Sequence, residues 1–489
     1  MKKFFAVLLL FVANLVMAQT EGTHVFDIWP GTKGSVPRYF TIFKNKLYLM
    51  ASDTNFVANL YCIDATGSLK KISNVNGDMW QAGYSIISDT RHMADVWDDA
   101  GKEIALYMPG NNGSTGWELF KYDGVSSSQT LAYEFVPGSQ SLDPYYLSKE
   151  FIADNDKIYL SCNSMLYMYD IKLNKGFVID SSVTGIKNIT IYKGKVYYSC
   201  GTDDVFCYDP YLASVSSVAD YGNATNDVQY MVVIQGNLYI GVINKGLYQY
   251  NGTTAPVKVA DYSSYTTSMD KTWPIGEYNG RVYFSCNGTD GVCRLCEFDP
   301  VTKNVKKFST GLNPSSFAVC DGKLYFSACD AYPNYELWSY NGITNPKLEV
   351  ELMPGSNVGG EPFYITSYNH ALYFDAQCSN GFELIRYTPN PGLWSSGISN
   401  VFFSGKVKVY PNPTVGSCNI QLSLENAQSI QCDLFDVSGK MVYNSPQSDY
   451  PKGVSTIDIS MANLQPGVYY LRLSDVAGKL LYADKVLKH

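Results

Sequence analysis

"DGKLYFSA" at Asp321–Ala328 is the stretch that decides the fold, because related stretches recur along the chain. Each has a polar turn followed by an apolar residue and a tyrosine, a pattern typical of a β-strand. The others are "KNKLYLMAS", "GKEIALYM", "NDKIYLSC", "KGKVYYSC", "QGNLYIGV", "NGRVYFSC" and "NHALYFDA". Their tyrosines are Tyr48, Tyr107, Tyr159, Tyr197, Tyr239, Tyr283, Tyr325 and Tyr373, at spacings of 59, 52, 38, 42, 44, 42 and 48 residues. A period near 42 is typical of a four-stranded propeller blade.

Two further elements complete the repeated unit. A second strand ends in an Asx turn, as in "WELFKYDG" and "YELWSYNG". Some units are linked by a Pro-Gly turn followed, seven or eight residues later, by another proline, as in "DIWPGTKGSVPRYFTI" and "ELMPGSNVGGEPFYIT". We therefore expect an all-β propeller of eight blades, with seven as the alternative because the insert Asp78–Lys102 makes the second unit irregular. Alternating tyrosines in such strands are expected to pack between the blades.

The first strand of the chain is expected to close the ring. "HVFDIWPG" at His24–Gly31 resembles the last strand of a unit, "LEVELMPG" at Leu348–Gly355. The final unit, which ends at Phe382–Tyr387, has no evident strand of this kind. The N-terminal strand is therefore predicted to complete the last blade, which ties the two ends together and protects an edge.

These units resemble the Glu-Leu-Trp…Asp-Gly-Thr propeller repeats of bacterial surface and secreted proteins. Glu336-Leu337-Trp338 and Glu118-Leu119-Phe120 carry the resemblance best, and it covers about Val25–Pro389. The units around Tyr159 and Tyr197 lack the triplet and are assigned on strand pattern alone.

The N-terminus is typical of a secretory signal. Lys2 and Lys3 precede the apolar run Phe4–Val16, and a cleavage site lies between Ala18 and Gln19. The run is too short to span a membrane, and no later stretch is long and apolar enough to do so. The region 19–405 has 27 basic and 38 acidic residues, a net charge of −11, which argues against nucleic acid and anionic membranes as partners.

The tail Lys406–His489 contains about seven short alternating segments, so a small antiparallel, immunoglobulin-like sandwich is expected. Pro411 and Pro413 cannot donate ladder hydrogen bonds and should end its first strand. The tail is similar to the type A sorting domain of the type IX secretion system of Bacteroidetes. The residues that carry this similarity include Tyr410, Pro411, Asn412, Pro413, Gly439, Lys440, Gly467, Tyr469, Lys485 and Lys488.

The resemblance implies Sec export to the periplasm, passage across the outer membrane with the type IX machinery as partner, and removal of the tail. The product would be released or attached to surface lipopolysaccharide. The predicted organisation is a signal peptide (1–18), the propeller (19–390), a linker (391–405) and the sorting domain (406–489).

Twelve cysteines are compatible with disulfides in an exported protein. Three pairs across likely hairpins or consecutive strands are candidates: Cys200–Cys207, Cys286–Cys293 and Cys418–Cys432. Cys293 and Cys296 form a CxxC pair, but no second Cys or His pair follows at the spacing of a zinc site. We expect structural or free thiols, no metal and no cofactor.

Catalysis is not the favoured interpretation. The four histidines are His24, His92, His370 and His489, and no nucleophile-elbow motif accompanies them. Loop acids such as Asp98, Asp99, Asp203, Asp204 and Asp290 favour a second hypothesis, a glycan-active enzyme with channel carboxylates.

A binding or adhesion module for a glycan or a protein is the first hypothesis, and a structural surface component is the third. Aromatic side chains in loops are the candidate ligand contacts: Trp80, Trp97, Trp117, Tyr265, Trp273 and Tyr332. The sequence does not choose the ligand or the binding face.

Overall fold

Antiparallel four-stranded sheets follow one another along the chain in the computed structural model. The structure describes residues 22–488 except 55–57, 73–92, 99–102, 112–113, 115–116, 136–150, 163–164, 202–203, 223–227, 244, 262–274, 288–292, 331–332, 355–358, 390–404, 413, 425–426, 437–440 and 475–479. Six sheets are single blades, and a seven-stranded sheet joins two more because β25 (Val305–Cys320) runs from one blade into the next. The prediction of eight blades is therefore confirmed, and the seven-blade alternative is not.

Each blade has an inner, a second, a third and an outer strand. The inner strands are β2 (Arg38–Phe43), β6 (Ala94–Trp97), β10 (Phe151–Asp154), β14 (Lys187–Tyr192), β18 (Val228–Ile234), β22 (Gly276–Tyr278), the second half of β25, and β29 (Phe363–Tyr368). The second strands are β3 (Lys46–Ser52), β7 (Glu103–Asn111), β11 (Lys157–Cys162), β15 (Lys195–Cys200), β19 (Asn237–Val242), β23 (Arg281–Asn287), β26 (Lys323–Cys329) and β30 (Ala371–Cys378).

The third strands are β4 (Ala58–Ile63), β8 (Trp117–Tyr122), β12 (Met165–Asp170), β16 (Asp204–Asp209), β20 (Gly246–Tyr250), β24 (Cys293–Phe298), β27 (Tyr335–Tyr340) and β31 (Gly381–Tyr387). The outer strands are β5 (Leu69–Lys71), β9 (Thr130–Tyr133), β13 (Lys175–Asp180), β17 (Ser214–Asp220), β21 (Val257–Ala260), the first half of β25, β28 (Lys347–Val350) and β1 (Thr23–Phe26).

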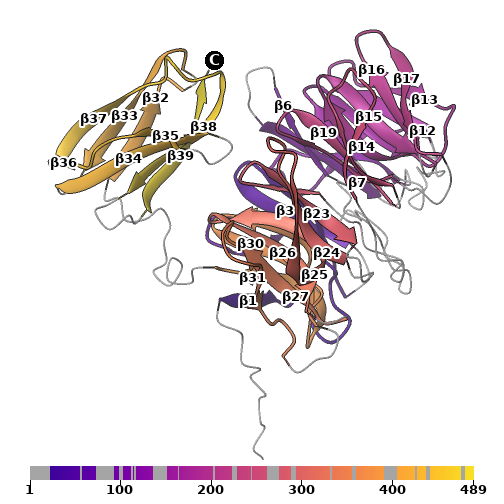
Figure 1. Cartoon of the computed structure of the whole chain (residues 1–489), viewed down its shortest axis with the longest axis horizontal. Helices are drawn as coiled ribbons and strands as arrows, with labels where there is room; N and C mark the ends of the chain where they lie inside the picture. Colours follow the sequence, from indigo (N-terminus) through magenta and orange to yellow (C-terminus); the bar gives the residue numbers. More distant parts are fainter. Residues whose placement is uncertain are drawn as a thin grey trace, which may run out of the picture.

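The N-terminal strand closes the ring, as predicted. β1 pairs antiparallel with β31, with Thr23 opposite Tyr387 and Phe26 opposite Leu384. Figure 1 shows this junction, with the indigo strand β1 beside the orange strand β31. The backbone N–H of Thr388 also donates to the carbonyl oxygen of Gly22, at 2.9 Å. The last blade is therefore built from both ends of the propeller.

The repeated tyrosines lie between the blades. All eight are at most 2% exposed, which confirms their predicted structural role. Each interface between neighbouring blades has its own apolar cluster. At seven interfaces the tyrosine of the second strand contacts an aromatic ring at the end of the third strand of the next blade, with centroids 5.7–6.4 Å apart: Tyr48–Tyr122, Tyr107–Tyr169, Tyr159–Tyr208, Tyr197–Tyr250, Tyr239–Phe298, Tyr283–Tyr340 and Tyr325–Tyr387.

The eighth interface differs in this respect. Tyr373 of the last blade lies in one cluster with Ile63, which ends the third strand of the first blade. An aromatic pair contributes about 0.5–1.5 kcal/mol beyond the burial of its area. The seam at which the ring closes is therefore the one interface where isoleucine takes the place of the second ring.

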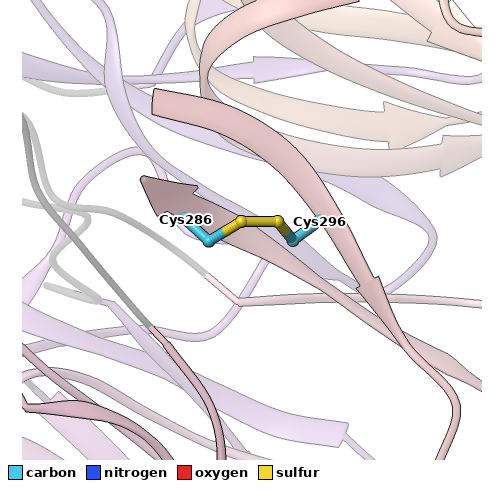
Figure 2. The surroundings of a disulfide bond; sticks show 2 residues. All are labelled: Cys286 and Cys296. Atoms are coloured by element: carbon cyan, nitrogen blue, oxygen red, sulfur yellow. A yellow bond between two sulfur atoms is a disulfide. The ribbon is translucent and has the colours of Figure 1, made fainter. Parts of the chain in front are cut away.

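The disulfide pairing differs from the prediction. Cys286 on β23 bonds to Cys296 on β24, and their Cα atoms are 6.0 Å apart (Figure 2). The register places Cys286 opposite Arg294 and Cys293 opposite Asn287. Because side chains alternate between the faces of a strand, Cys293 lies on the face opposite to Cys286 and cannot reach it.

The other two predicted pairs are also absent among the described residues. Cys200 lies opposite Asp204 and Cys207 opposite Tyr197, so these two thiols occupy opposite faces of their blade and form no disulfide with each other. Cys418 and Cys432 are free and buried in one core, where they come from different sheets of the tail. Burial raises the pKa of the Cys432 thiol to about 12.

The tail folds as the predicted sandwich. One sheet contains β32 (Gly405–Tyr410), β33 (Ser417–Leu424) and β37 (Gly453–Ser460). The other contains β35 (Met441–Asn444), β34 (Gln428–Asp436), β38 (Gly467–Ser474) and β39 (Leu480–Lys488), with β36 (Ser448–Tyr450) paired to β34. The short strand β36 raises the count to eight, one more than predicted. β33 alternates between buried and partly exposed residues, and its apolar face lies in the core.

The first strand of the tail ends where the prolines begin. β32 stops at Tyr410, and the peptide bond between Tyr410 and Pro411 is cis. The sequence prediction for this stop is therefore confirmed. The described residues form strands and turns, and no helix among them is long and apolar enough to cross a membrane.

Candidate functional site

Two of the six aromatic residues predicted to contact a ligand lie within the described part of the chain. Trp97 ends the inner strand β6, is 43% exposed, and its Nε1–H donates to Asp95 Oδ2 at 2.6 Å. Trp117 begins β8. Trp80, Tyr265, Trp273 and Tyr332 lie outside the described residues. The prediction that Trp97 and Trp117 lie in loops is therefore wrong, because both belong to strands, and a ligand site at the other four positions stays a prediction.

One histidine is paired with a carboxylate. His370 lies in the turn between β29 and β30, and its Nδ1 is 2.7 Å from Asp321 Oδ1, in the corresponding turn of the preceding blade. The Asp321 carboxylate raises the pKa of His370 by hydrogen bonding to the imidazole. In a catalytic triad a carboxylate orients the imidazole, and a nucleophile hydrogen bonds to the other ring nitrogen. The contact seen here, between His370 and Asp321, connects the turns of two neighbouring blades.

Among the described residues, His24 is the other histidine, and no carboxylate contact is found for its ring. His24 is exposed on β1 and contacts Phe26 edge to face, with centroids 4.5 Å apart. Partial burial of the ring, followed by the charge of Arg386, lowers the pKa of His24. His92 and His489 lie outside the described residues. Of the loop acids, Asp98 and Asp204 are described, whereas Asp99, Asp203 and Asp290 are not.

Sequence reasoning did not anticipate two buried carboxyl groups between the last and the first blade. Asp375 on β30 is 2% exposed and Glu383 on β31 is fully buried. Burial raises the pKa of Asp375 well above its usual range, although the nearby charge of Arg38 opposes this. Burial also raises the pKa of Glu383 to about 7. Perturbed acids of this kind are found at catalytic sites and in structural networks.

The hydrogen bonds of Glu383 indicate a structural role. Its carboxyl oxygens accept from the backbone N–H groups of Ile28 and Trp29, each at 3.2 Å, and from the hydroxyl of Ser35. All three donors belong to the connection between β1 and β2. Glu383 therefore fixes the segment that leads from the closing strand into the first blade.

The same arrangement recurs in two other blades. Glu336 on β27 accepts from the N–H groups of Leu352 and Met353, at 2.7 and 3.4 Å, and burial raises its pKa to about 7. Glu118 on β8 accepts from the N–H of Phe135 at 2.7 Å. In each case the glutamate of the Glu-Leu pair binds the backbone just before a Pro-Gly turn. The signal was in the sequence, because the Glu-Leu pairs and the Pro-Gly connections occur in the same units.

Two glycines let these connections pass between the blades. Gly34 and Gly359 have φ angles of +75° and +72°, and a Cβ at either position would collide with the backbone of Phe382 or Tyr335. The N–H of Val36 donates to Phe382 O at 3.0 Å, and that of Glu361 to Tyr335 O, also at 3.0 Å. Only glycine combines this backbone conformation with so close an approach. Each of these two connections therefore packs closely against the third strand of the preceding blade, β31 or β27.

Two spaces on the propeller, a small cavity and an open groove, differ in the size of the ligand that they could hold. A cavity of about 20 Å³ lies beside Arg38, Tyr39 and Ser52, and it has room for one water molecule. An open groove of about 350 Å³ lies between the outer strand β21 and the first half of β25. Lys258, Asp261 and Lys307 line it together with Val259, Ala260 and Val305, and Lys258 Nζ is 3.0 Å from Asp261 Oδ1. Of these two spaces, the groove is the one large enough for a sugar unit.

In the tail, two of the predicted sorting motifs meet. Asn412 Oδ1 accepts the N–H of Leu487, and the N–H of Thr414 donates to the carbonyl of Leu487, both at 2.8 Å. Lys488 Nζ donates to the carbonyl of Val415 at 2.8 Å. The segment after β32 therefore holds the last strand of the chain.

The other sorting residues have different surroundings. Tyr469 is buried and its hydroxyl donates to Gln465 O at 2.7 Å, whereas Tyr410 is exposed. Gly467 begins β38 and Lys485 lies on β39. Pro413, Gly439 and Lys440 lie outside the described residues, as do Ala18 and Gln19 of the predicted cleavage site.

Comparison with protein families supports the assignment of the tail as a secretion sorting domain. Residues 408–487 match the secretion system C-terminal sorting domain. This match supports export by the type IX secretion system to the outer surface or the medium. No curated protein matches the chain in sequence.

Solved structures resemble the chain at low identity. BamB from Moraxella catarrhalis is 13% identical, with a TM-score of 0.43, over 75% of this chain and 98% of that one. The computationally designed Ika8 protein is 8% identical, with a TM-score of 0.46, over 73% and 98%. Dipeptidyl peptidase 4 of Porphyromonas gingivalis is 8% identical, with a TM-score of 0.42, over 81% and 65%.

Proposed function

We propose that this chain is a type A substrate of the type IX secretion system and that its propeller is a non-catalytic binding or adhesion module. The match of residues 408–487 to the sorting domain is the observation that carries the export part of the proposal. On this basis the tail is the address, and the propeller is the cargo that acts in the medium or on the outer cell surface of a member of the Bacteroidetes.

The buried acids support binding over catalysis. Glu118, Glu336 and Glu383 each accept backbone N–H groups from a connection between blades. A general acid or base must reach the proton that it transfers, within about 3 Å or through one water molecule. These carboxyl groups instead hold the scaffold, so the raised pKa values of Glu336 and Glu383 follow from burial in a structural role.

The ligand is proposed to be a glycan or a protein. Besides the predicted loops, the groove between β21 and β25 is a candidate surface because apolar side chains line it and Lys258 and Lys307 border it. Sugars bind through apolar contact together with a few oriented polar groups. The lysines would favour a polysaccharide with carboxylate or sulfate groups.

Binding of the purified protein to an immobilised panel of polysaccharides and glycoproteins tests the proposal. We expect saturable binding to one class, weakened at least tenfold by Lys258→Ala with Lys307→Ala if the groove is the site, or by Trp97→Ala or Trp273→Ala if the loops are. Val178→Ala, on the outer strand of another blade, is the matched control. Release of shortened sugar chains would instead favour the glycan-active enzyme.

Export is tested separately in the native host. Removal of residues 406–489 should retain the propeller inside the cell envelope, and mass spectrometry of the secreted protein should find Gln19 at its N-terminus. Unchanged secretion without the tail would contradict the export route, whatever the ligand assay shows.

A further inference from the structure

Within the part of the chain that the structure describes, the outer strands of the blades pair on one side only, and most of the resulting edges carry a feature that prevents further pairing. A free edge is a template for pairing with another strand, and lysine is a common means of preventing it. β5, β13, β21, the first half of β25 and β28 each carry at least one lysine. β1 and β9 carry none, but each has only four residues.

β17 of the fourth blade lacks both forms of protection. With seven residues it is the longest outer strand that is separate from its neighbouring blade, and "SVSSVAD" contains no lysine or arginine. Its first four residues, Ser214–Ser217, are all exposed. A bulge interrupts the pairing with β16 after Ser217, so these four residues form the regular part of the free edge.

The turn before β17 adds exposed apolar surface at the same edge. Tyr211 is 95% exposed and Leu212 is 66% exposed. Asp209 organises this turn by accepting the N–H groups of Tyr211 and Leu212, at 2.9 and 3.2 Å. The turn is therefore fixed, and its two large side chains project beside an unprotected strand.

We propose that β17 is a docking edge for the β17 strand of a second copy of this chain, in antiparallel orientation about a two-fold axis. With the axis at Ser216, Ser216 faces its own copy and Val215 faces Ser217 of the other chain. Antiparallel pairing of identical strands gives a closed dimer in which both copies use the same surface.

Charge explains why a second copy fits this edge. The residues paired around the axis, Ser214 to Val218, are uncharged, so no like charges are placed opposite each other there, which would weaken the pairing. In this register Asp220 lies opposite Leu212 of the other chain, away from the second Asp220. A partner strand with charged side chains would find no opposite charge on Ser214–Ser217. A neutral strand fits, and the chain itself supplies one.

Sedimentation velocity of the purified full chain tests the proposal. We expect a monomer–dimer equilibrium that Val215→Lys or Ser217→Lys weakens at least tenfold, or about 1.4 kcal/mol. Val178→Lys on β13 is the matched control, because Val178 is exposed on an outer strand that already contains Lys175. Circular dichroism verifies that all variants are folded.

Two further measurements test the register and the nature of the contact. Ser216→Cys should form a disulfide-linked dimer on mild oxidation, whereas Ser214→Cys should not. Because region 19–405 has a net charge of −11, added salt should strengthen the dimer by screening repulsion. A protein that stays monomeric at high concentration, or a dimer that survives both lysine variants, would overturn the proposal. Absence of the cross-link at Ser216 would overturn the two-fold register.

Discussion

The buried glutamates should make the stability of the propeller depend on pH in an unusual direction. Burial raises the pKa of Glu336 and of Glu383 from 4.5 to about 7, against the hydrogen bonds that they accept. For a group whose pKa is higher in the folded than in the unfolded state, stability is fully present below the unfolded value. It is lost as the pH rises through the folded value. Stability should therefore fall between about pH 5 and pH 8.

The expected magnitude follows from the size of the shift. A change from 4.5 to about 7 corresponds to roughly 3 kcal/mol for each glutamate, because one pKa unit is about 1.4 kcal/mol. Asp375 acts in the same direction, since burial also raises its pKa. Glu383→Gln removes the buried charge and keeps an oxygen acceptor for the N–H groups of Ile28 and Trp29. In this variant, the part of the pH-dependent loss of stability that is due to Glu383 should disappear.

Urea unfolding followed by tryptophan fluorescence across this pH range measures the effect. Glu349→Gln is the matched control, because hydrogen bonds from Ser339 and nearby lysines hold the pKa of Glu349 below its usual value despite burial. That variant should lose stability at neutral pH without changing the slope between about pH 5 and pH 8. A wild-type protein that becomes more stable over this range, or an unchanged slope in Glu383→Gln, would refute the reasoning.

Three other changes have defined outcomes. Gly34→Ala or Gly359→Ala should lower the free energy of unfolding by about 2 kcal/mol or more, whereas Gly194→Ala, with φ of +70° and open space, should cost only about 1 kcal/mol; equal losses in a urea titration would contradict the collision. Cys286→Ser opens a disulfide between cysteines ten residues apart and should cost about 2–3 kcal/mol, a loss that reduction of the wild type should reproduce. Asn412→Ala removes the acceptor for Leu487 and should speed amide exchange there, whereas Tyr410→Ala should leave the rate unchanged.

The repeat could be predicted from the sequence because each blade repeats one solution to the same packing problem. The tyrosine of "KLYFS" is buried between blades, so it recurs at the same position of each unit. The number of such tyrosines therefore predicted the number of blades. Closure of the ring was also predictable, because the N-terminus had a strand that belonged to no unit and the last unit lacked its outer strand. Both inferences rest on local patterns that are read once per repeat.

Features that depend on the face of a strand were harder to predict. Cys286 and Cys293 have a suggestive spacing, but seven residues along a hairpin placed them on opposite faces, and Cys296 was the partner instead. The glutamates of the Glu-Leu pairs looked like repeat markers, and their bonds to connections 16 to 355 residues away emerge only in three dimensions. Of the six predicted aromatic contacts, Trp97 and Trp117 belong to strands, and the other four lie outside the described residues.

The place of β31 between β30 and β1 has a mechanical consequence. The chain leaves the propeller directly after β31, so a pull on the C-terminal unit reaches the ring through this strand. Hydrogen-bond ladders flank it on both sides, and such a pull would load them lengthwise, all bonds at once. The strand contributed by the other end of the chain thus acts as a clamp that shares the tension. A propeller attached through its C-terminal end in flowing medium would therefore be held by a strand that is paired on both sides.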